Sequence, residues 1–270
     1  MPPISKLAPK ALNYMSNKMT PTISVAIATY NETDTIKTCL DSVTSWVSEI
    51  VLYDGQSTDD TLSMVKKYKN IKIISGINHP LFHLNKQTAI DACTSDWILQ
   101  LDADEVVTQK LADEIRHTIK DTSINGYWIP RQNFFLGKFL TKGGVYPDPT
   151  LRLYRKGFGK LPCVDVHEQA TVEGQTGTLV NDLLHYADPT FERFLLRNNR
   201  YSSLLAAHLK NPSFFNYFFI KPLITFVSLF FRHRGYVDGF PGFVFAFYSA
   251  LRFPAAYVKY WELFHAKNRH

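Results

Sequence analysis

The chain of 270 residues contains only three cysteines, Cys39, Cys93 and Cys163, which are widely spaced and odd in number. This pattern provides neither a disulfide framework nor a zinc-ligand spacing, so we expect a reducing compartment. The first residues lack the long apolar stretch of a signal peptide, and we expect residues 1–21 to form a leader. No GxGxxG motif follows the first predicted strand and no Walker A motif occurs, which excludes the dinucleotide fingerprint and the P-loop.

Acidic residues are scarce in the last quarter of the chain. Residues 200–270 hold 9 Lys/Arg but 2 Asp/Glu, whereas residues 1–199 hold 21 and 22, so the net charge of +6 resides in the C-terminal segment. The same segment carries 20 of the 38 aromatic residues. Such a composition suits a membrane surface, an anionic ligand or nucleic acid. Because no nucleic-acid-binding signature accompanies the charge, we expect no nucleic-acid partner.

Regular alternation of strand and helix patterns begins near Thr22. Apolar, β-branched segments predict buried strands over residues 23–30, 49–54, 71–75 and 96–102, with amphipathic helical segments between them. In the first of these helices, Asn31 or Thr33 is the expected cap. This order is typical of βαβ units, so we predict an α/β fold with a mostly parallel sheet flanked by helices. Beyond residue 125 the alternation fades into shorter aromatic strands, and a further helix is expected over 191–211.

Polar residues follow three of the predicted strands: Tyr30-Asn31-Glu32, Asp54-Gly55-Gln56-Ser57 and Asp102-Ala103-Asp104-Glu105. Ligands of open parallel sheets bind at the carboxyl ends of the strands, where these clusters meet. Adjacent carboxylates suit Mg²⁺ or Mn²⁺, so a divalent cation carrying a diphosphate is the expected positive partner of the acids. The alternative is that these acids only cap the helix that follows them.

Three segments in this order, SVAIATYNETDTIKTCLDSV, EIVLYDGQSTDDT and DWILQLDADE, resemble family 2 inverting nucleotide-sugar glycosyltransferases with the GT-A fold. Further segments (GYWIPRQNFFLGK, GGVYPDPTLRLYRKG, VHE, LLHY, NRYS and RGYVDGFPGF) are similar to the bacterial branch that includes lipopolysaccharide-core β-glucosyltransferases. The resemblance covers about residues 22–262. It implies a GT-A (Rossmann-like) catalytic domain over 22–190 and a helical extension over 191–270.

The resemblance also implies roles for individual residues. Tyr30, Glu32 and Asp54 would line the nucleoside pocket, and Lys86 would approach the nucleotide or its phosphates. Asp102 would lie near the ribose, while Asp104 and His185 would bind the metal. One departure is the turn Asp54-Gly55-Gln56-Ser57, where relatives place the glycine one residue later.

On the acceptor side, Glu168 corresponds to the family's catalytic acid and would take the proton of the acceptor hydroxyl. His167 would position or bind the acceptor, and Arg152 and Arg155 would bind an anionic acceptor. The residues alone leave simpler alternatives open. Glu168 could be a surface acid, His185 a core or capping histidine and Lys86 a solvated helix residue, and the two arginines could belong to a salt-bridged strand edge.

The C-terminal segment contains two apolar stretches, residues 213–231 and 240–261. Lys221-Pro222 interrupts the first, and Gly242, Arg252 and Pro254 interrupt the second. Short broken apolar stretches with basic and aromatic margins indicate helices that lie in a membrane interface. The alternatives are packing on the catalytic domain, oligomerisation, or a true membrane span.

Together these observations predict an inverting, metal-dependent glycosyltransferase that moves a hexose from a nucleotide sugar to a saccharide acceptor on a lipid. We expect the donor to be a UDP-sugar and the acceptor to be a lipopolysaccharide core or a related glycolipid. The enzyme would be cytoplasmic and peripheral on the inner face of the cytoplasmic membrane, with Mg²⁺ or Mn²⁺ as cofactor. One alternative is a polyprenyl-phosphate sugar transferase. Another, of a different class, is a non-catalytic protein that binds a membrane surface or an anion. The oligomeric state is left open.

Overall fold

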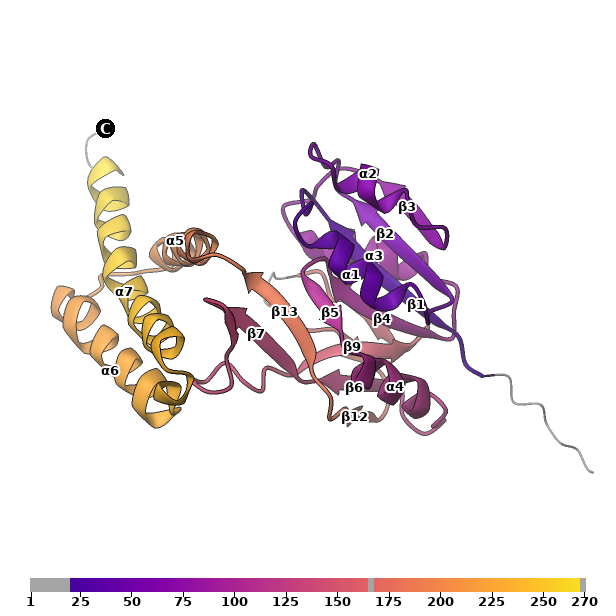
Figure 1. Cartoon of the computed structure of the whole chain (residues 1–270). Helices are drawn as coiled ribbons and strands as arrows, with labels where there is room; N and C mark the ends of the chain where they lie inside the picture. The colour runs from indigo at the N-terminus through magenta and orange to yellow at the C-terminus, as the bar shows by residue number, and fades with distance from the viewer. Residues whose placement is uncertain (1–19, 165–167, 268–270) are drawn as a thin grey trace, which may run out of the picture.

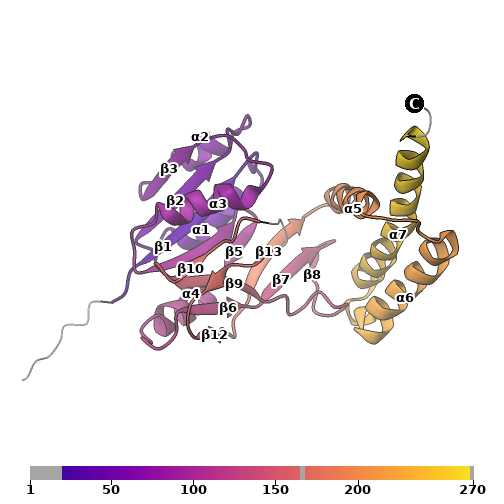
Figure 2. The ribbon, with the colours of Figure 1, turned by 180° about the vertical axis from the view of Figure 1, so that it is seen from behind.

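A computed structural model describes residues 20–164 and 168–267 of the chain. Its largest element is a seven-stranded sheet in the order β12-β6-β9-β4-β1-β2-β3 (Figures 1 and 2). The central strands β4, β1, β2 and β3 are parallel, while β9 is antiparallel to both β4 and β6. The prediction of an α/β fold with a parallel core flanked by helices is therefore confirmed.

The strands are β1 (Ile23–Thr29), β2 (Glu49–Asp54), β3 (Ile71–Ser75), β4 (Trp97–Asp102), β5 (Glu105–Val107), β6 (Gly126–Ile129), β7 (Arg131–Phe135), β8 (Lys138–Phe139), β9 (Thr150–Arg155), β10 (Gly159–Lys160), β11 (Thr171–Val172), β12 (Thr176–Thr178) and β13 (Leu183–Asp188). The helices are α1 (Ile36–Val43), α2 (Thr61–Val65), α3 (Phe82–Asp91), α4 (Gln109–Thr118), α5 (Phe191–Ala207), η1 (Asn216–Ile220), α6 (Lys221–Val227), η2 (Ser228–Arg232), η3 (Gly235–Asp238) and α7 (Phe240–Lys267).

The two faces of the central sheet are covered by different helices because successive side chains of a strand point to opposite faces. On one face, Val25 and Ile27 of β1 pack with Leu40 of α1 and Leu111 of α4. On the other face, Ala26 packs with residues of α3. Burying both faces explains why β1, β2 and β4 are apolar at most positions on either side.

A second, four-stranded sheet lies beside the first, in the order β5-β13-β7-β8. Its strands β5 and β13 pair antiparallel, which places His185 opposite Glu105 and so beside the end of β4. The predicted domain division at residue 190 falls between β13 and α5. Beyond it, α5, α6 and α7 form a helical unit at the end of the molecule away from β3 (Figure 1).

The helical unit is joined to the sheets by an apolar cluster in which Phe135 of β7 contacts Phe194 of α5 and Phe245 of α7. A buried carboxylate adds a second connection. Asp238 accepts hydrogen bonds from the backbone N–H groups of Thr141 and Lys142 at 2.9 and 2.8 Å. Because apolar packing and a buried hydrogen-bonded carboxylate both cross this boundary, the helical unit has a defined place against the sheets.

The prediction that prolines break the C-terminal helices was wrong. Pro222 lies in the first turn of α6, directly after the π-helical turn η1, and Pro254 lies inside the continuous 28-residue helix α7. A widened turn before a proline relieves the clash of its ring with the preceding carbonyl, so the helix continues through this position. Among the helices of residues 20–164 and 168–267, none has the length and apolarity needed to cross a membrane.

Candidate active site

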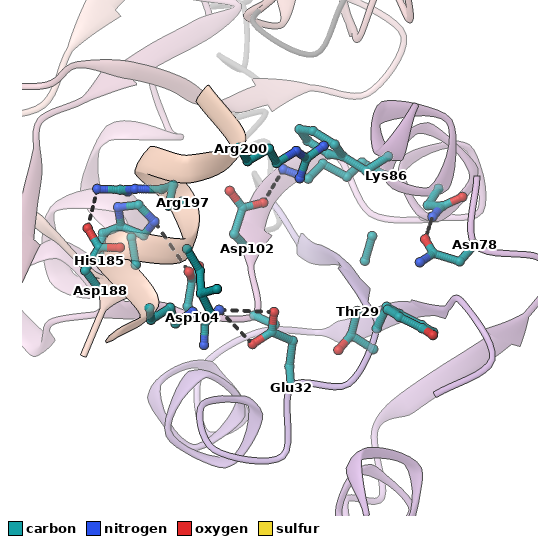
Figure 3. Close-up of a pocket in the computed structure, with 18 residues that line it drawn as sticks. Thr29, Glu32, Asn78, Lys86, Asp102, Asp104, His185, Asp188, Arg197 and Arg200 are labelled. Atoms are coloured by element: carbon teal, nitrogen blue, oxygen red, sulfur yellow. Dashed lines mark hydrogen bonds and ion pairs between the residues drawn. The ribbon is translucent and has the colours of Figure 1, made fainter. Parts of the chain in front are cut away.

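The carboxyl ends of β1 and β4 open into a pocket of about 660 Å³, here called the main pocket (Figure 3). Parallel pairing sets Ala28 beside Asp102, so the residues after both strands converge on one edge of the sheet. The lining consists of Ala28, Thr29, Tyr30, Glu32, Asn78, Phe82, Asn85, Lys86, Asp102, Ala103, Asp104, His185, Ala187, Asp188, Arg193, Leu196, Arg197 and Arg200.

Of the residues predicted from the sequence, Tyr30, Glu32, Lys86, Asp102, Asp104 and His185 all line the main pocket. Asp54 does not. Its side chain is buried and accepts hydrogen bonds from the backbone N–H groups of Gln56 and Ser57, both at 3.1 Å. Asp54 therefore stabilises the turn after β2. Its place in the nucleoside pocket stays a prediction.

That turn carries the departure noted in the sequence. Gln56 has a φ of 65°, in the left-handed region that favours glycine, at the position where the family resemblance leads us to expect one. Gly55 allows a close approach, because a Cβ there would lie 3.0 Å from Cβ of Asn78. Asn31, also at positive φ, accepts a hydrogen bond from the N–H of Thr58 at 2.8 Å and so holds the turn to β1. The expectation that Asn31 or Thr33 caps α1 was wrong, since Thr35 is the N-cap residue.

Basic side chains of the same chain are the positive partners of the acids after β4. Asp102 pairs with Nζ of Lys86 on one side and with Arg152 on the other, where the N···O distance is 2.6 Å. Burial opposes ionisation of Asp102, but the charges of Arg152 and Lys86 outweigh it and hold its pKa well below the usual range. Arg152 continues to the fully buried Glu105 at 2.8 Å.

Arg131 extends this network, because it contacts Glu105 at 3.3 Å and Asp148 at 2.6 Å. Arg152, predicted to bind an anionic acceptor, is thus buried and ion-paired within the protein. Arg155 donates to the backbone carbonyls of Ile124 and Asp121 and lies over the ring of Trp97. Arg152 matches the simpler alternative of a salt-bridged strand edge, whereas Arg155 is held at that edge by backbone carbonyls.

Asp104 and His185 form a second pair at the edge of the main pocket. The Nε2 atom of His185 lies 3.5 Å from a carboxylate oxygen of Asp104. Burial raises the pKa of Asp104, but the hydrogen bond and charge of His185 outweigh it, so the net shift is downward. On the other side of the ring, Nδ1 lies 2.6 Å from Oδ1 of Asn133.

The amide of Asn133 determines which ring nitrogen faces Asp104. Its Nδ2 donates to the backbone carbonyl of Val145 at 3.2 Å, which directs Oδ1 towards His185. Nδ1 must then carry a hydrogen, and Nε2 is the ring nitrogen that faces the Asp104 carboxylate. A proton on Nε2 links the two groups directly, and in its place a metal cation would be held by Nε2 and the carboxylate together.

This donor set fits Mg²⁺ or Mn²⁺, which bind one or two protein groups together with phosphate oxygens and water. Within the described part of the chain, no group of three or more His, Cys, Asp or Glu side chains is arranged to hold a metal ion. Asp104 and His185 would therefore supply the protein ligands, and the remaining ligands would come from the bound substrate and water.

A second pocket of about 170 Å³, here called the side pocket, adjoins the main pocket and shares Phe82, Lys86 and Asp102 with it. Glu168 lines the side pocket, where its carboxylate accepts from the N–H of Val164 at 3.1 Å. Nδ1 of the buried His83 lies 3.4 Å from Oε1 of Glu168. His167, the other predicted acceptor residue, lies outside the described residues.

Sequence reasoning missed the wall that α5 contributes to the main pocket. Arg193, Arg197 and Arg200 line it and are spaced four and three residues apart, so they share one face of the helix. Arg193 contacts Glu32 at 3.4 Å, and Arg197 pairs with the buried Asp188. The helical spacing of these arginines was readable in the sequence, but the face they meet was not.

Comparison with known proteins agrees with this geometry. The family model for glycosyl transferase family 2 matches residues 24–168. The chain therefore belongs to glycosyl transferase family 2.

Two relatives illustrate how far the similarity extends. The lipopolysaccharide core biosynthesis glycosyltransferase LpsC of Rhizobium meliloti is 29% identical over 247 residues, which covers 85% of this chain and 91% of that protein. An uncharacterized glycosyltransferase of Rickettsia typhi is 28% identical over 250 residues, covering 85% of each chain. At this coverage the similarity extends beyond the catalytic domain into the C-terminal extension.

Among solved structures, the mannosyltransferase PcManGT from Pyrobaculum calidifontis, in complex with GDP-Man and Mn²⁺, superposes with a TM-score of 0.52. The match covers 90% of this chain and 88% of that chain at 13% identity. At this identity the likeness concerns the fold alone. The chain has the GT-A fold that its sequence predicted.

Proposed function

We propose that this protein is an inverting glycosyltransferase that moves a hexose from a nucleoside-diphosphate sugar to a saccharide acceptor carried by a lipid. The observation that carries the proposal is the pair of Asp104 and His185, whose carboxylate oxygen and Nε2 atom lie 3.5 Å apart at the edge of the main pocket. Membership of the family supports the reaction class, and similarity to LpsC supports a saccharide acceptor.

The donor would occupy the main pocket. Tyr30 and Glu32 lie where a nucleoside would bind, and Asp102 is held rigid and ionised by Lys86 and Arg152. A divalent ion on Asp104 and His185 would neutralise charge on the diphosphate as it leaves. The charges of the pocket lining favour a bound divalent ion. Four acidic side chains are matched by four Lys and Arg side chains, so the protein alone has no large positive excess to neutralise the negative charge of a diphosphate.

The acceptor would enter from the side pocket, where Glu168 lies. The acceptor oxygen would form a bond to the anomeric carbon while the bond from that carbon to the diphosphate breaks. The nucleoside diphosphate would leave with the bonding electron pair, and the Glu168 carboxylate would take the proton of the attacking hydroxyl. Direct displacement of this kind inverts the anomeric centre.

The helical unit supports a lipid-borne acceptor. Its exposed side chains include Phe215, Leu223 and Ile224, each 62% exposed, on the helix formed by residues 214–232. Arg232 and Arg234 follow at the end of this helix, next to the aromatic face. Exposed apolar groups beside basic ones suit an interface with anionic lipid, and the acceptor would then reach the site from the membrane surface.

The alternative of a polyprenyl-phosphate sugar transferase relied on Arg152, Arg155 and the basic C-terminal segment. Both arginines are instead engaged inside the protein, so no observation at these two positions favours that alternative.

Donor binding and hydrolysis test the proposal. The purified protein is offered UDP-, GDP-, ADP- and CMP-sugars with Mn²⁺, with Mg²⁺ and with chelator, alongside Asp104→Asn. Asp113→Asn is the matched control, because Asp113 is an exposed carboxylate on α4. The proposal requires metal-dependent binding of one donor that is lost in Asp104→Asn and kept in Asp113→Asn. Absence of binding to every donor would overturn it.

A further inference from the structure

Helix α5 belongs to the C-terminal extension, yet one of its faces forms a wall of the main pocket. Arg193, Leu196, Arg197 and Arg200 occupy successive turns on that face. In Figure 3, Arg200 and Lys86 lie on the same side of the pocket, while Asp104 and His185 lie on another. The extension therefore reaches the pocket at a point away from the Asp104–His185 pair.

The arginines of this face differ in their partners. Arg193 contacts Glu32, and Arg197 pairs with Asp188. Arg200 is exposed and makes no hydrogen bond or ion pair with any residue in the described ranges 20–164 and 168–267. A guanidinium left without a carboxylate inside a pocket is available to a ligand.

The neighbouring charges do not provide a partner for Arg200. Lys86, Arg152 and Arg131 are balanced one for one by Asp102, Glu105 and Asp148 in the ion-pair network. Asp102 pairs with both Lys86 and Arg152, so that carboxylate has no charge left to neutralise Arg200. The positive charge of Arg200 is therefore a surplus at this side of the pocket.

We propose that Arg200, together with Lys86, binds a phosphate group in the main pocket, so that the C-terminal extension contributes directly to substrate binding. Guanidinium groups bind phosphate through two parallel hydrogen bonds, and the ammonium of Lys86 adds a second donor. This proposal rests on the proposed function, because it takes the pocket to be the donor site. The phosphate belongs either to the donor diphosphate or to a phosphorylated acceptor.

The test compares Arg200→Ala and Arg200→Lys with the wild-type protein by calorimetric titration of UDP and GDP, each against its monophosphate, with Mn²⁺ present. Arg116→Ala is the matched control, because it removes an exposed arginine of α4 that pairs with Asp113. Thermal melts of each variant establish that it is folded. Inorganic phosphate is then titrated into the protein saturated with the nucleotide that binds.

If Arg200 holds the donor diphosphate, Arg200→Ala weakens diphosphate binding about 10- to 100-fold, the range of one charge-assisted contact, and Arg200→Lys restores part of it. If it holds a phosphate of the acceptor, nucleotide binding is unchanged, but phosphate binding to the saturated protein is lost in Arg200→Ala. Either result supports the proposal.

If Arg200→Ala binds the nucleotide and the phosphate as tightly as Arg116→Ala does, the proposal is overturned and the proposed function is left intact. If the wild-type protein binds inorganic phosphate in an Arg200-dependent way but no nucleotide, the proposed function fails and the phosphate site stands. If it binds neither probe, both fail.

Discussion

The side chain of Asn133 lies 2.6 Å from Nδ1 of His185 and thereby decides which nitrogen of that ring faces Asp104. The two residues come from adjacent, parallel strands, β7 and β13, whose register sets Asn133 beside His185. An oriented imidazole is a better metal ligand than a mobile one, because its lone pair is already aligned.

Replacing Asn133 by Ala is expected to weaken Mn²⁺ binding about 10- to 100-fold, since the ring of His185 loses the group that fixes its tautomer. Asn133→Asp keeps an oxygen acceptor towards Nδ1 and should retain most of the affinity. Mn²⁺ titration followed by electron paramagnetic resonance measures both variants. Equal affinities of the Ala variant and the wild type would show that Asn133 does not orient the ligand.

Asp102→Asn is expected to lower the free energy of unfolding at neutral pH by about 3 kcal/mol, because it leaves the buried Arg152 without half of its charge compensation. The depressed pKa of Asp102 in the folded protein means that its ionised form stabilises the fold above the unfolded value. That stabilisation is lost as the pH falls below about 4.

Urea unfolding from pH 7 down to pH 3 measures this dependence. The wild type should lose stability more steeply below pH 4 than Asp102→Asn, and Asp113→Asn should behave as the wild type, because Asp113 is an exposed carboxylate. Parallel pH profiles for wild type and Asp102→Asn would contradict the assignment.

Gln56→Gly is expected to stabilise the protein by about 1 kcal/mol, because a side chain at a φ of 65° is strained and glycine is not. Gly55→Ala should have the opposite sign, since the added Cβ would meet Asn78 at 3.0 Å. Thermal unfolding of the two variants gives the comparison. A loss of stability in Gln56→Gly would show that the turn tolerates the left-handed residue without strain.

Glu168→Gln is expected to lower kcat for transfer by at least about 100-fold with donor binding unchanged, because the amide cannot accept the acceptor proton. Glu173→Gln is the control, since Glu173 is an exposed acid that lines neither the main nor the side pocket. Steady-state transfer from the donor found by the donor screen to a lipid-linked saccharide acceptor provides the measurement. Retention of full kcat would assign the base to another residue.

Membrane contact through the helical unit predicts binding to vesicles that contain about one-third anionic lipid, weakened by high salt. The triple variant Phe215→Ser, Leu223→Ser and Ile224→Ser should bind at least about tenfold more weakly, as three exposed apolar side chains are lost. Val180→Ser is the control, because Val180 is 82% exposed but lies next to the sheet. Vesicle sedimentation that is equal for the triple variant and the wild type would place the contact elsewhere.

Much of the fold was predictable because its signals are local. Apolar runs rich in β-branched residues predicted the strands between Ile23 and Asp102. Amphipathic spacing predicted α4 and α5. The continuity of α7 through Pro254 was not predictable from such rules. Packing against other helices stabilises a helix through a proline that would end it in isolation.

The sequence by itself determined that three polar clusters would follow parallel strands, and therefore that Glu32, Asp102 and Asp104 would share one edge of the sheet. Parallel pairing brings the carboxyl ends of neighbouring strands to the same edge of the sheet, whatever residues follow them. Only the tertiary structure decided which charges compensate the acids, because Lys86, Arg152 and Arg131 come from segments far apart in the chain. It likewise placed Arg200 of the extension in the pocket wall, since the packing of α5 against the sheets depends on contacts that no local pattern encodes.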